Sequence, residues 1–285
     1  MATQIHPTAV VASGAELGTD VVIGPYSVVG GQSRIGDRTR LGPHVVIDGV
    51  TRIGADNVIV GQANLGGPPQ DLSYRGEPTW LEIGDGNTVR EFVTINRGTV
   101  KGGGLTKIGS GCLLMACCHV AHDCEVGDRV ILANGVLLAG HVRVCEGANV
   151  GGSSAANQFV TIGRYAYIGG MTRVPQDVPP FMILEGHQAR VRQVNVVGLE
   201  RAGFDARQIE ALQNAFRLIY RSGAPQRHSL DQLLADPRTN AEVLELCAAL
   251  EEQSRGLKGR YRESLRDSFL QLGRSRILGE PHVVA

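Results

Sequence analysis

Apolar residues recur every six positions through most of the chain. Every sixth position from Ile5 to Leu65 is Val, Ile or Leu, and the same phase returns over residues 83–95. A second phase holds over residues 108–174, with a single alanine as its departure. An α-helix has a period of 3.6 and a strand a period of two, so neither explains the pattern. A hexapeptide period is typical of a parallel β-helix, in which three short strands close one triangular coil.

Glycine often follows the periodic aliphatic residue, as in Ile23-Gly24, Ile53-Gly54 and Ile168-Gly169. The corners between short strands need a tight backbone, which glycine provides without a steric penalty from Cβ. These glycines therefore support a solenoid with three corners in each coil. The period does not determine the handedness of the coil.

Two segments interrupt the repeat, residues 66–80 and residues 96–107. Both are polar and rich in glycine, and the first also contains three of the prolines. We predict that each forms a loop that projects from the solenoid. Insertions of this kind are frequently where a repeat protein carries its function.

The six-residue pattern ends near residue 190. We predict a β-helix domain over residues 1–190, which carries the two loops, and an α-helical domain over residues 191–285. Residues 256–285 have a mixed, partly basic composition that predicts no particular element. The predicted fold class is thus mainly β with a helical C-terminal domain.

Helical signals begin after this boundary. Asp205 followed by Gln208 resembles a capping box, and further helices are predicted to begin at Ser229 and at Asn240. Three apolar positions are predicted to form one face of the last helix: Leu244, Cys247 and Leu250.

Composition narrows the classes of function. Lys plus Arg equals Asp plus Glu, at 28 residues each, so no bulk charge favours nucleic acid or a membrane surface. No signal peptide and no apolar run of membrane-spanning length is evident. The six cysteines show neither a CxxC pair nor the spacing of a disulfide framework. A reduced, cytoplasmic protein without an integral membrane segment is expected.

The candidate chemistry lies in the second half of the repeat. Histidine is scarce, yet His119, His122 and His141 fall close together in the sequence. Because one coil takes about 18 residues, Gly140 is predicted to stack on His122, and His141 on Asp123. Adjacent strands lie roughly 4.8 Å apart, so these groups come within reach of one another.

This set of groups suits acyl transfer. A neutral histidine accepts a proton from a hydroxyl near pH 7, which makes His122 a candidate general base. The carboxylate of Asp123 would orient the imidazole, and the N–H of Gly140 would stabilise an oxyanion. No serine occupies the stacked positions, so direct attack without a covalent enzyme intermediate is favoured.

Two other interpretations remain open on the residues alone. The cluster can be the outer wall of a solenoid without catalytic chemistry. Alternatively, the dense Cys and His residues over 117–124 resemble zinc ligands, and solenoids of the γ-class carbonic anhydrase type bind zinc through histidines. Neighbouring strand residues such as Cys117 and Cys118 point to opposite faces, which disfavours a shared ion. We therefore expect no metal and no other cofactor.

Many short motifs of the chain form a joint pattern. They include His6-Pro7-Thr8-Ala9, Gln70-Asp71-Leu72, Gly76-Glu77-Pro78-Thr79, Arg97-Gly98-Thr99, Gly102-Gly103-Gly104-Leu105, Leu138-Ala139-Gly140-His141, Gln176-Asp177-Val178-Pro179-Pro180 and Leu218-Ile219-Tyr220-Arg221. Together these motifs resemble one family, the UDP-N-acetylglucosamine O-acyltransferases that use acyl carrier protein as donor. The resemblance is close up to about residue 225 and looser beyond it.

The resemblance implies a left-handed β-helix that assembles as a homotrimer with active sites between neighbouring solenoids. It implies transfer of an (R)-3-hydroxyacyl group from acyl carrier protein to the 3-hydroxyl of UDP-N-acetylglucosamine, the first step of lipid A biosynthesis. His122, Asp123 and Gly140 match the general base, its orienting carboxylate and the oxyanion donor. The positions that match contacts to the sugar nucleotide are Asp71, Ser73, His119, His141, Gln158, Asn195 and Arg201.

The acyl groove and the docking of the carrier protein also follow from the resemblance. Met115, Gly152 and Gly170 fall where the family lines its acyl groove, and glycine at position 170 implies an acyl chain longer than ten carbons. The carrier is acidic, so a basic surface is expected to receive it. Candidate residues cluster near the start of the helical region: Arg190, Arg192, Arg207, Arg217, Arg221 and Arg227.

One departure from the family bears on the acceptor. Ser73 stands where the family commonly has lysine, so a cation beside the sugar nucleotide is missing. A lysine would repel a protonated amino group, and serine relieves that repulsion. An alternative hypothesis is therefore that the acceptor is the 3-amino analogue of the sugar nucleotide and that the product is an amide.

Overall fold

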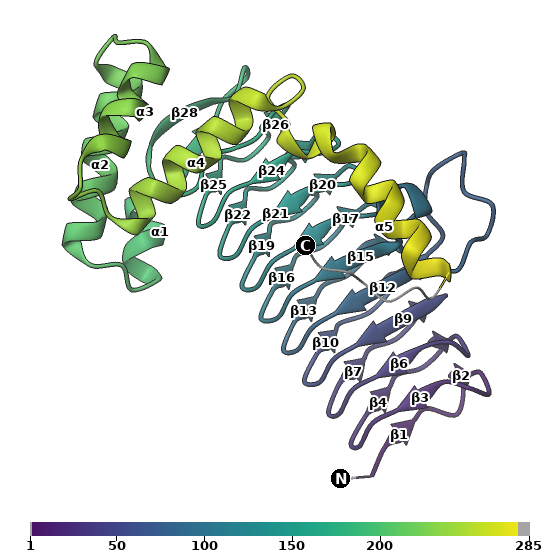
Figure 1. Ribbon diagram of the computed structural model, residues 1–285. Coiled ribbons are helices and arrows are strands. Elements are labelled where there is room, and N and C mark those ends of the chain that lie inside the picture. The colour runs from purple at the N-terminus through teal and green to yellow at the C-terminus, as the bar shows by residue number, and fades with distance from the viewer. Residues whose placement is uncertain (1, 279–285) are drawn as a thin grey trace.

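The computed structural model describes residues 2–278. Residues 4–194 form a left-handed parallel β-helix of triangular cross-section, and helices follow at its C-terminal end (Figure 1). Each strand pairs with the strand one coil further along, so three parallel sheets run the length of the solenoid. The fold class predicted from the six-residue period is confirmed.

The first sheet has eleven strands and is the longest of the three. Its last pair, β27 with β28, is antiparallel and forms a hairpin that ends the solenoid. The strands, in spatial order, are β1 (Gln4–Ile5), β4 (Val22–Ile23), β7 (Arg40–Leu41), β10 (Val58–Ile59), β13 (Thr88–Val89), β16 (Leu113–Leu114), β19 (Ile131–Leu132), β22 (Asn149–Val150), β25 (Tyr167–Ile168), β27 (Met182–Glu185) and β28 (Arg190–Val194).

The second sheet has nine strands and the third has eight, all parallel. The second contains β2 (Val10–Val11), β5 (Val28–Val29), β8 (Val46–Ile47), β11 (Asn64–Gly67), β14 (Thr94–Asn96), β17 (His119–Val120), β20 (Leu137–Leu138), β23 (Ala155–Ala156) and β26 (Arg173–Val174). The third contains β3 (Glu16–Leu17), β6 (Arg34–Ile35), β9 (Val50–Ile53), β12 (Trp80–Ile83), β15 (Leu105–Ile108), β18 (Glu125–Val126), β21 (Arg143–Val144) and β24 (Thr161–Ile162).

The periodic aliphatic residues fill the interior of the solenoid. From Ile23 to Val174 they are buried and form one continuous core. The first coil departs from this pattern, because Ile5 is exposed and Val11 and Leu17 are only partly buried. The pattern is the same there, but within residues 2–278 no coil stacks on the outer side of the first one.

The two predicted loops are shorter than the interruptions in the sequence. Strands β11 and β12 extend into the first interruption, and β14 and β15 extend into the second. In the second loop, a single turn of 3-10 helix, η1 (Val100–Gly102), is capped by Thr99. The longer strands β9, β12 and β15 pair over four residues in register, which fixes the base of both loops.

The helices after the solenoid are α1 (Val196–Arg201), α2 (Ala206–Arg221), α3 (Gln226–Ala235) and α4 (Ala241–Arg255). The predicted capping box is present at the start of α2, and Asn240 caps α4 as predicted. The prediction that a helix begins at Ser229 is wrong, since α3 begins at Gln226 and Ser229 is a buried residue within it. Leu244 is also exposed, because the buried face of α4 runs through Leu246 instead.

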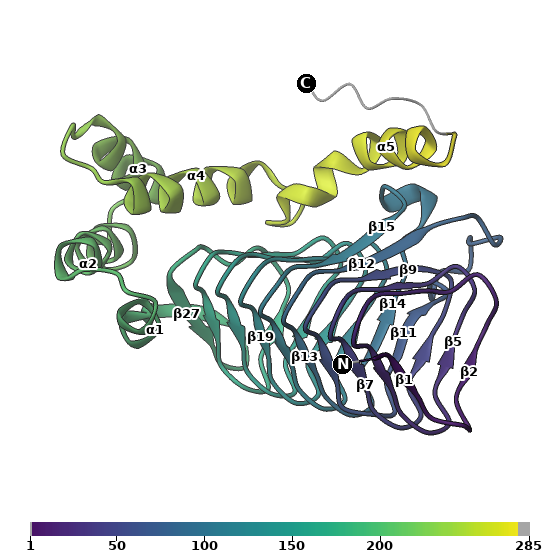
Figure 2. The same cartoon turned by 90° about the horizontal axis from the view of Figure 1, so that it is seen from below.

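The chain then turns back onto the solenoid. A 3-10 helix, η2 (Tyr261–Leu265), leads into α5 (Arg266–Leu278), which lies over the side of the β-helix that contains β12 and β15 (Figure 2). We refer to residues 259–278 as the C-terminal strap. Among residues 2–278, no helix has the length and apolar character needed to cross a membrane.

Candidate active site

The stacking predicted from the repeat is confirmed. His119 pairs with Leu137 and Val120 with Leu138, so two residues further on His122 lies beside Gly140. The backbone N–H of His141 donates to the carbonyl of His122 over 3.0 Å. The 18-residue coil therefore brings together groups that the sequence separates, at the corner that follows β17 and β20.

His122 and Asp123 form a buried hydrogen-bonded pair. The Nδ1 of His122 lies 2.7 Å from Oδ2 of Asp123, and both side chains are almost fully buried. An ionised carboxylate only accepts hydrogen bonds, so Nδ1 carries the proton and Nε2 keeps a free lone pair. This tautomer leaves His122 able to accept a proton at Nε2.

The second loop holds the carboxylate of Asp123. Thr99 donates its backbone N–H to Oδ1 and its hydroxyl to Oδ2, each over 2.7 Å. The backbone N–H of Asp123 donates to the hydroxyl of Thr106 over 2.8 Å. A Cβ on Gly102 would overlap the carboxylate, so the glycine lets η1 approach closely. The loop thus fixes the group that orients His122.

Gly140 lies directly against the imidazole. A Cβ built on Gly140 would lie 2.6 Å from Cε1 and 2.9 Å from Nε2 of His122, closer than ordinary van der Waals contact allows. No residue among 2–278 accepts a hydrogen bond from the N–H of Gly140. An unused backbone donor beside a base is the arrangement that stabilises an oxyanion.

His141 is stacked between ring systems. Its ring lies 4.2 Å from that of Phe159 at an interplanar angle of 4°, and it meets His122 edge-on at 5.2 Å. Burial lowers the pKa of His141 to about 4, and the neighbouring carboxylate of Asp123 opposes this shift without overcoming it. His141 is therefore neutral near pH 7 and can exchange hydrogen bonds with a polar ligand.

The imidazole of His122 lines a cavity of about 540 Å³. The first loop contributes Asp71, whose pKa is lowered by hydrogen bonds from the backbone N–H and the hydroxyl of Ser73, each 2.7 Å long. The second loop contributes Lys101, whose Nζ lies 3.9 Å from Asp71. The lining residues are Gln70, Asp71, Leu72, Lys101, His122, His141, Gln158, Phe159, Arg266, Asp267 and Leu270.

Lys101 bears on whether the acceptor is a hydroxyl or an amino sugar. The sequence suggested that Ser73 leaves this part of the site without a cation, which favoured an amino acceptor. Lys101 supplies a cation beside Asp71 from the other loop, so the physical ground for the amino analogue is lost. A loop contact of this kind has no signal in the sequence, because the two residues belong to different insertions.

Two further predicted residues lie at the same corner. His119 is half-buried, and its Nδ1 is hydrogen-bonded to the hydroxyl of Thr94 over 2.8 Å. Desolvation lowers the pKa of His119, and the nearby His122 adds to this effect. Gln158 precedes Phe159 and is exposed at the mouth of the cavity. Seven residues were predicted to contact the sugar nucleotide, and five of them lie around His122: Asp71, Ser73, His119, His141 and Gln158.

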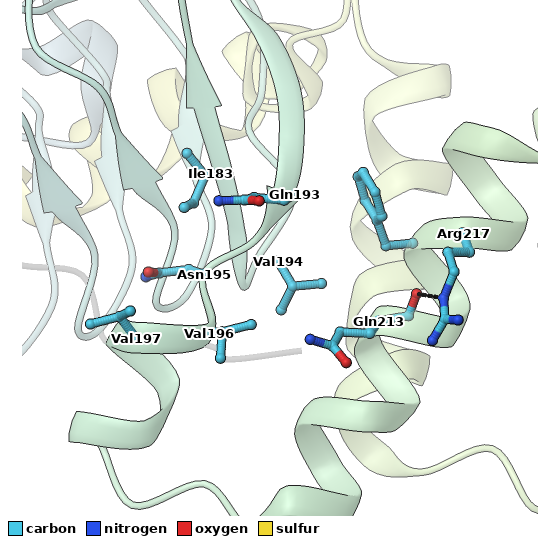
Figure 3. A pocket seen from close by; sticks show the side chains of 9 residues that line it. Ile183, Gln193, Val194, Asn195, Val196, Val197, Gln213 and Arg217 are labelled. Atoms are coloured by element: carbon cyan, nitrogen blue, oxygen red, sulfur yellow. Dashed lines mark hydrogen bonds between the residues drawn. The ribbon is translucent and has the colours of Figure 1, made fainter.

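Asn195 and Arg201 lie elsewhere in the chain. Asn195 lines a separate cavity of about 500 Å³ between the hairpin and α2 (Figure 3). It also caps α1, since its Oδ1 accepts from Gly198 and its Nδ2 donates to the carbonyl of Tyr165. Arg201 is the exposed last residue of α1. Within one chain, neither residue belongs to the His122 cavity.

The predicted acyl-groove residues lie at the corner that follows the strands of the first sheet: Met115 follows β16 on the coil of His122, and Gly152 and Gly170 follow β22 and β25 on later coils. Gly152 and Gly170 stack on one another, and a Cβ on Gly170 would lie 3.3 Å from the carbonyl oxygen of Gly152. Gly170 is exposed, and Met115 is half-buried. A larger side chain at position 170 would therefore lie on the outside of the solenoid, in close contact with the backbone of Gly152.

A metal site was the competing interpretation of the cluster. Cys117 and Cys118 are not the strand residues that the sequence suggested, because they lie in the turn before β17, where Cys117 has a left-handed backbone. Cys117 is exposed while Cys118 is buried. The ligand atoms of His122, Asp123 and His141 lie within 4.8 Å of one another, so they are close enough to share an ion. Thr99 already donates a hydrogen bond to each oxygen of Asp123, and the pair with His122 uses a further lone pair. The hydrogen bonding accounts for the arrangement without an ion.

The comparisons with known proteins agree with the geometry. Residues 177–258 match the family described as Udp N-acetylglucosamine O-acyltransferase, Domain 2, and residues 105–140 match the bacterial transferase hexapeptide family. An acyl-(acyl-carrier-protein)–UDP-N-acetylglucosamine O-acyltransferase of Anaeromyxobacter dehalogenans is 47% identical over 253 residues, which cover 89% of this chain and 98% of the relative. The corresponding protein of Verminephrobacter eiseniae is 48% identical over 90% of this chain and 99% of the relative.

Solved structures of similar sequence and fold belong to the same family. The structure of LpxA from Acinetobacter baumannii superposes with a TM-score of 0.83 at 42% identity, covering 87% of this chain and 96% of that protein. The structure of UDP-N-acetylglucosamine acyltransferase from Francisella novicida has a TM-score of 0.82 at 31% identity and covers 85% of this chain. The chain therefore belongs to the LpxA family of hexapeptide acyltransferases, the acyl-(acyl-carrier-protein)–UDP-N-acetylglucosamine O-acyltransferases.

Proposed function

We propose that this acyltransferase moves an (R)-3-hydroxyacyl group from acyl carrier protein to the 3-hydroxyl of UDP-N-acetylglucosamine, the first step of lipid A biosynthesis. The observation that carries the proposal is the buried His122–Asp123 pair beside the unused N–H of Gly140. The relatives are named as O-acyltransferases that use these two substrates, which favours a hydroxyl over an amino acceptor.

The proposed reaction needs no covalent enzyme intermediate. Nε2 of His122 takes the proton from the sugar hydroxyl as its oxygen attacks the thioester carbonyl. The carboxylate of Asp123 accepts a hydrogen bond from Nδ1–H of His122 and stabilises the imidazolium that forms. The N–H of Gly140 donates to the oxyanion of the tetrahedral intermediate. Collapse of the tetrahedral intermediate breaks the carbon–sulfur bond. The sulfur of the carrier takes the proton from His122 and leaves as a thiol.

Within this proposal, the remaining residues bind substrate. Asp71, His119 and His141 hold the sugar, with Ser73 fixing the carboxylate of Asp71 and Gln158 beside the sugar. The acyl chain lies along the surface that includes Met115, Gly152 and Gly170, and the lack of a side chain at the exposed Gly170 suits a chain longer than ten carbons.

We also propose that the protein acts as a homotrimer with one active site in each cleft between solenoids. Asn195 and Arg201 then contact the nucleotide of a site formed with a neighbouring copy, since they line no part of the His122 cavity in their own chain. Leu72 and Met171 expose 99% and 84% of their surface, which suits burial against another solenoid.

The carrier protein is proposed to dock on the helical region, residues 191–285, and on the hairpin before it. The candidate arginines there lie on β28, α2 and α3, and a charge reversal such as Arg217→Glu should raise KM for the acyl carrier. We place the reaction in the cytoplasm, because all six cysteines are free thiols, as is usual in a reducing compartment.

The proposal is tested by an assay that combines two acceptors with a series of donors. The purified protein is incubated with UDP-N-acetylglucosamine or its 3-amino analogue, and with 3-hydroxyacyl carriers of different chain length. Mass detection of the product identifies an ester or an amide. We expect an ester with a donor longer than ten carbons, and higher kcat/KM for the amino acceptor would contradict the proposal.

A further inference from the structure

The C-terminal strap follows the last residue that the domain 2 family model matches. The family model ends at residue 258, whereas the strap occupies residues 259–278. Its side chains Arg266, Asp267 and Leu270 nevertheless line the cavity that contains His122. A segment beyond the family model thus forms one wall of the candidate active site.

Several specific contacts dock the strap. At its start, Asp177 donates its backbone N–H to the carbonyl of Gly259 and accepts from the N–H of Tyr261, each over 2.8 Å. Near its end, Arg276 donates to the carbonyl of Gly103 over 2.7 Å. Between these points, a Cβ on Gly273 would overlap the carbonyl of Val100. The helix α5 therefore lies directly on η1, in the loop that holds Asp123.

The most buried contact of the strap is made by Arg262. Its side chain is 8% exposed, its Nε donates to the carbonyl of His141 over 3.2 Å, and its second amino group donates to Glu125 over 2.9 Å. A buried guanidinium is costly unless its donors are satisfied. Burial alone would raise the pKa of Glu125, but Arg262 and Arg143 hold it below its ordinary value, so the pair is charged near neutral pH.

A second arginine of the strap extends the contact to the ring stack. The guanidinium of Arg266 lies 4.6 Å from the ring centroid of Phe159, which is itself stacked on His141. Glu263 accepts a hydrogen bond from Arg266 over 2.7 Å. Arg262 therefore contacts the backbone of His141, and Arg266 contacts the ring on which the imidazole of His141 is stacked.

We propose that Arg262 is a positioning residue of the catalytic centre, which holds the Gly140–His141 backbone against His122 through the carbonyl of His141. This inference rests on the proposed function. His141 has a left-handed backbone with φ of 65°, a conformation that non-glycine residues adopt at some cost. A charged donor on its carbonyl stabilises that conformation, and it thereby keeps the N–H of Gly140 aimed at the site of attack.

The test compares Arg262→Met with Arg262→Lys. Methionine replaces the apolar stem of the arginine but removes the charge and the donors, so kcat should fall about tenfold while KM for the acyl carrier changes little. Lysine keeps the charge but donates from a single nitrogen instead of a planar fork, so it should recover part of kcat. Arg238→Met is the control, because the side chain of Arg238 is 88% exposed and, within residues 2–278, forms an ion pair only with nearby Asp236. The kcat of this variant should stay within twofold of the wild type.

A second variant disturbs the contact between Arg262 and His141 indirectly, through the docking of α5. Gly273→Val prevents α5 from docking on Val100 without altering Arg262, and we expect it to lower kcat severalfold. Both variants are assayed per folded protein, with the folded fraction measured by circular dichroism and thermal unfolding. A wild-type kcat per folded Arg262→Met enzyme would overturn the proposal, as would a loss that only follows the folded fraction.

A readout without substrate separates this inference from the proposed function. Arg262 and Arg266 both lower the pKa of His141, with burial as the larger cause, while Asp123 raises it and His122 lowers it. Arg262→Met should therefore raise the pKa of His141 and shift the amide signal of Gly140 in NMR spectra of labelled protein. Unchanged signals would contradict positioning by Arg262, whereas an inactive wild type would contradict the proposed function alone.

Discussion

Two corners of the same solenoid carry a similar pair of rings in very different surroundings. Tyr26 and His44 are one coil apart, have left-handed backbones and stack at 5.2 Å with an interplanar angle of 16°. His141 and Phe159 are also one coil apart, have left-handed backbones and stack at 4.2 Å. The first pair is exposed and the second is buried.

The difference comes from what covers each corner. The second loop and the C-terminal strap pack around His141 and the neighbouring His122, whereas the first pair lies on coils that precede both loops. Burial strengthens the hydrogen bonds of the second corner and lowers the pKa of its histidine. The repeat supplies the stacking geometry in both places, and the added segments create the chemical environment in one of them.

The largest expected effect is a difference in kcat between alanine variants at the two corners. His122→Ala removes the proposed base and should lower kcat about 10³-fold, within the range typical of general base catalysis. His44→Ala is the matched control at the exposed corner and should retain wild-type kcat. Steady-state assays, with the oligomeric state checked by light scattering, make the comparison. More than a tenth of wild-type activity in His122→Ala would contradict the assignment of the base.

The second effect tests the close approach of Gly140. A methyl group there would displace the imidazole of His122, because the added Cβ lies 2.6 Å from Cε1. We expect Gly140→Ala to lower kcat about 10²-fold, because a displaced base loses part of the roughly 10²–10⁴-fold that general base catalysis contributes. Gly30→Ala is the control on an early coil, where the nearest atom lies at 3.2 Å. Equal kcat in the two variants would remove Gly140 from the mechanism.

The third effect concerns the coils beyond the catalytic corner. Gly170→Met places a side chain along the proposed acyl groove and should shift the preference between long and short donors by about tenfold. The backbone at position 170 does not require glycine, since its φ is outside the left-handed region. Competition between two acyl carriers measures the ratio directly. An unchanged chain-length profile would show that Gly170 does not limit the chain.

The smallest effect is on stability. The pKa of His141 is about 4 in the folded protein and about 6.5 in an unfolded chain, so between these values only the unfolded state binds the proton. The free energy of unfolding should therefore fall as the pH drops below about 6.5, by about 1 kcal/mol per unit. Urea unfolding of wild type and His141→Asn from pH 7 to 4.5 measures this, with His44→Asn as control. Parallel curves for wild type and His141→Asn would contradict the prediction.

Most of the fold was predictable because a solenoid is built from local rules. The aliphatic period gave the strands and the central stack, and the 18-residue coil predicted that Gly140 meets His122. The exposed Ile5 shows the limit of such a pattern, since burial at an end depends on what lies beyond it. The start of α3 was misplaced because a local capping signal at Ser229 is weaker than the tertiary packing that buries this residue.

The sequence alone determined the β-helix, its coil length and the meeting of His122, Asp123, Gly140 and His141, because the repeat converts sequence spacing into distance. Only the tertiary structure decided what surrounds them. Thr99 and Lys101 reach the site from a loop, and Arg262 reaches it from a helix that returns across the solenoid. The six-residue period does not predict such contacts between distant segments, since they depend on how the loops and the strap fold back onto the coils.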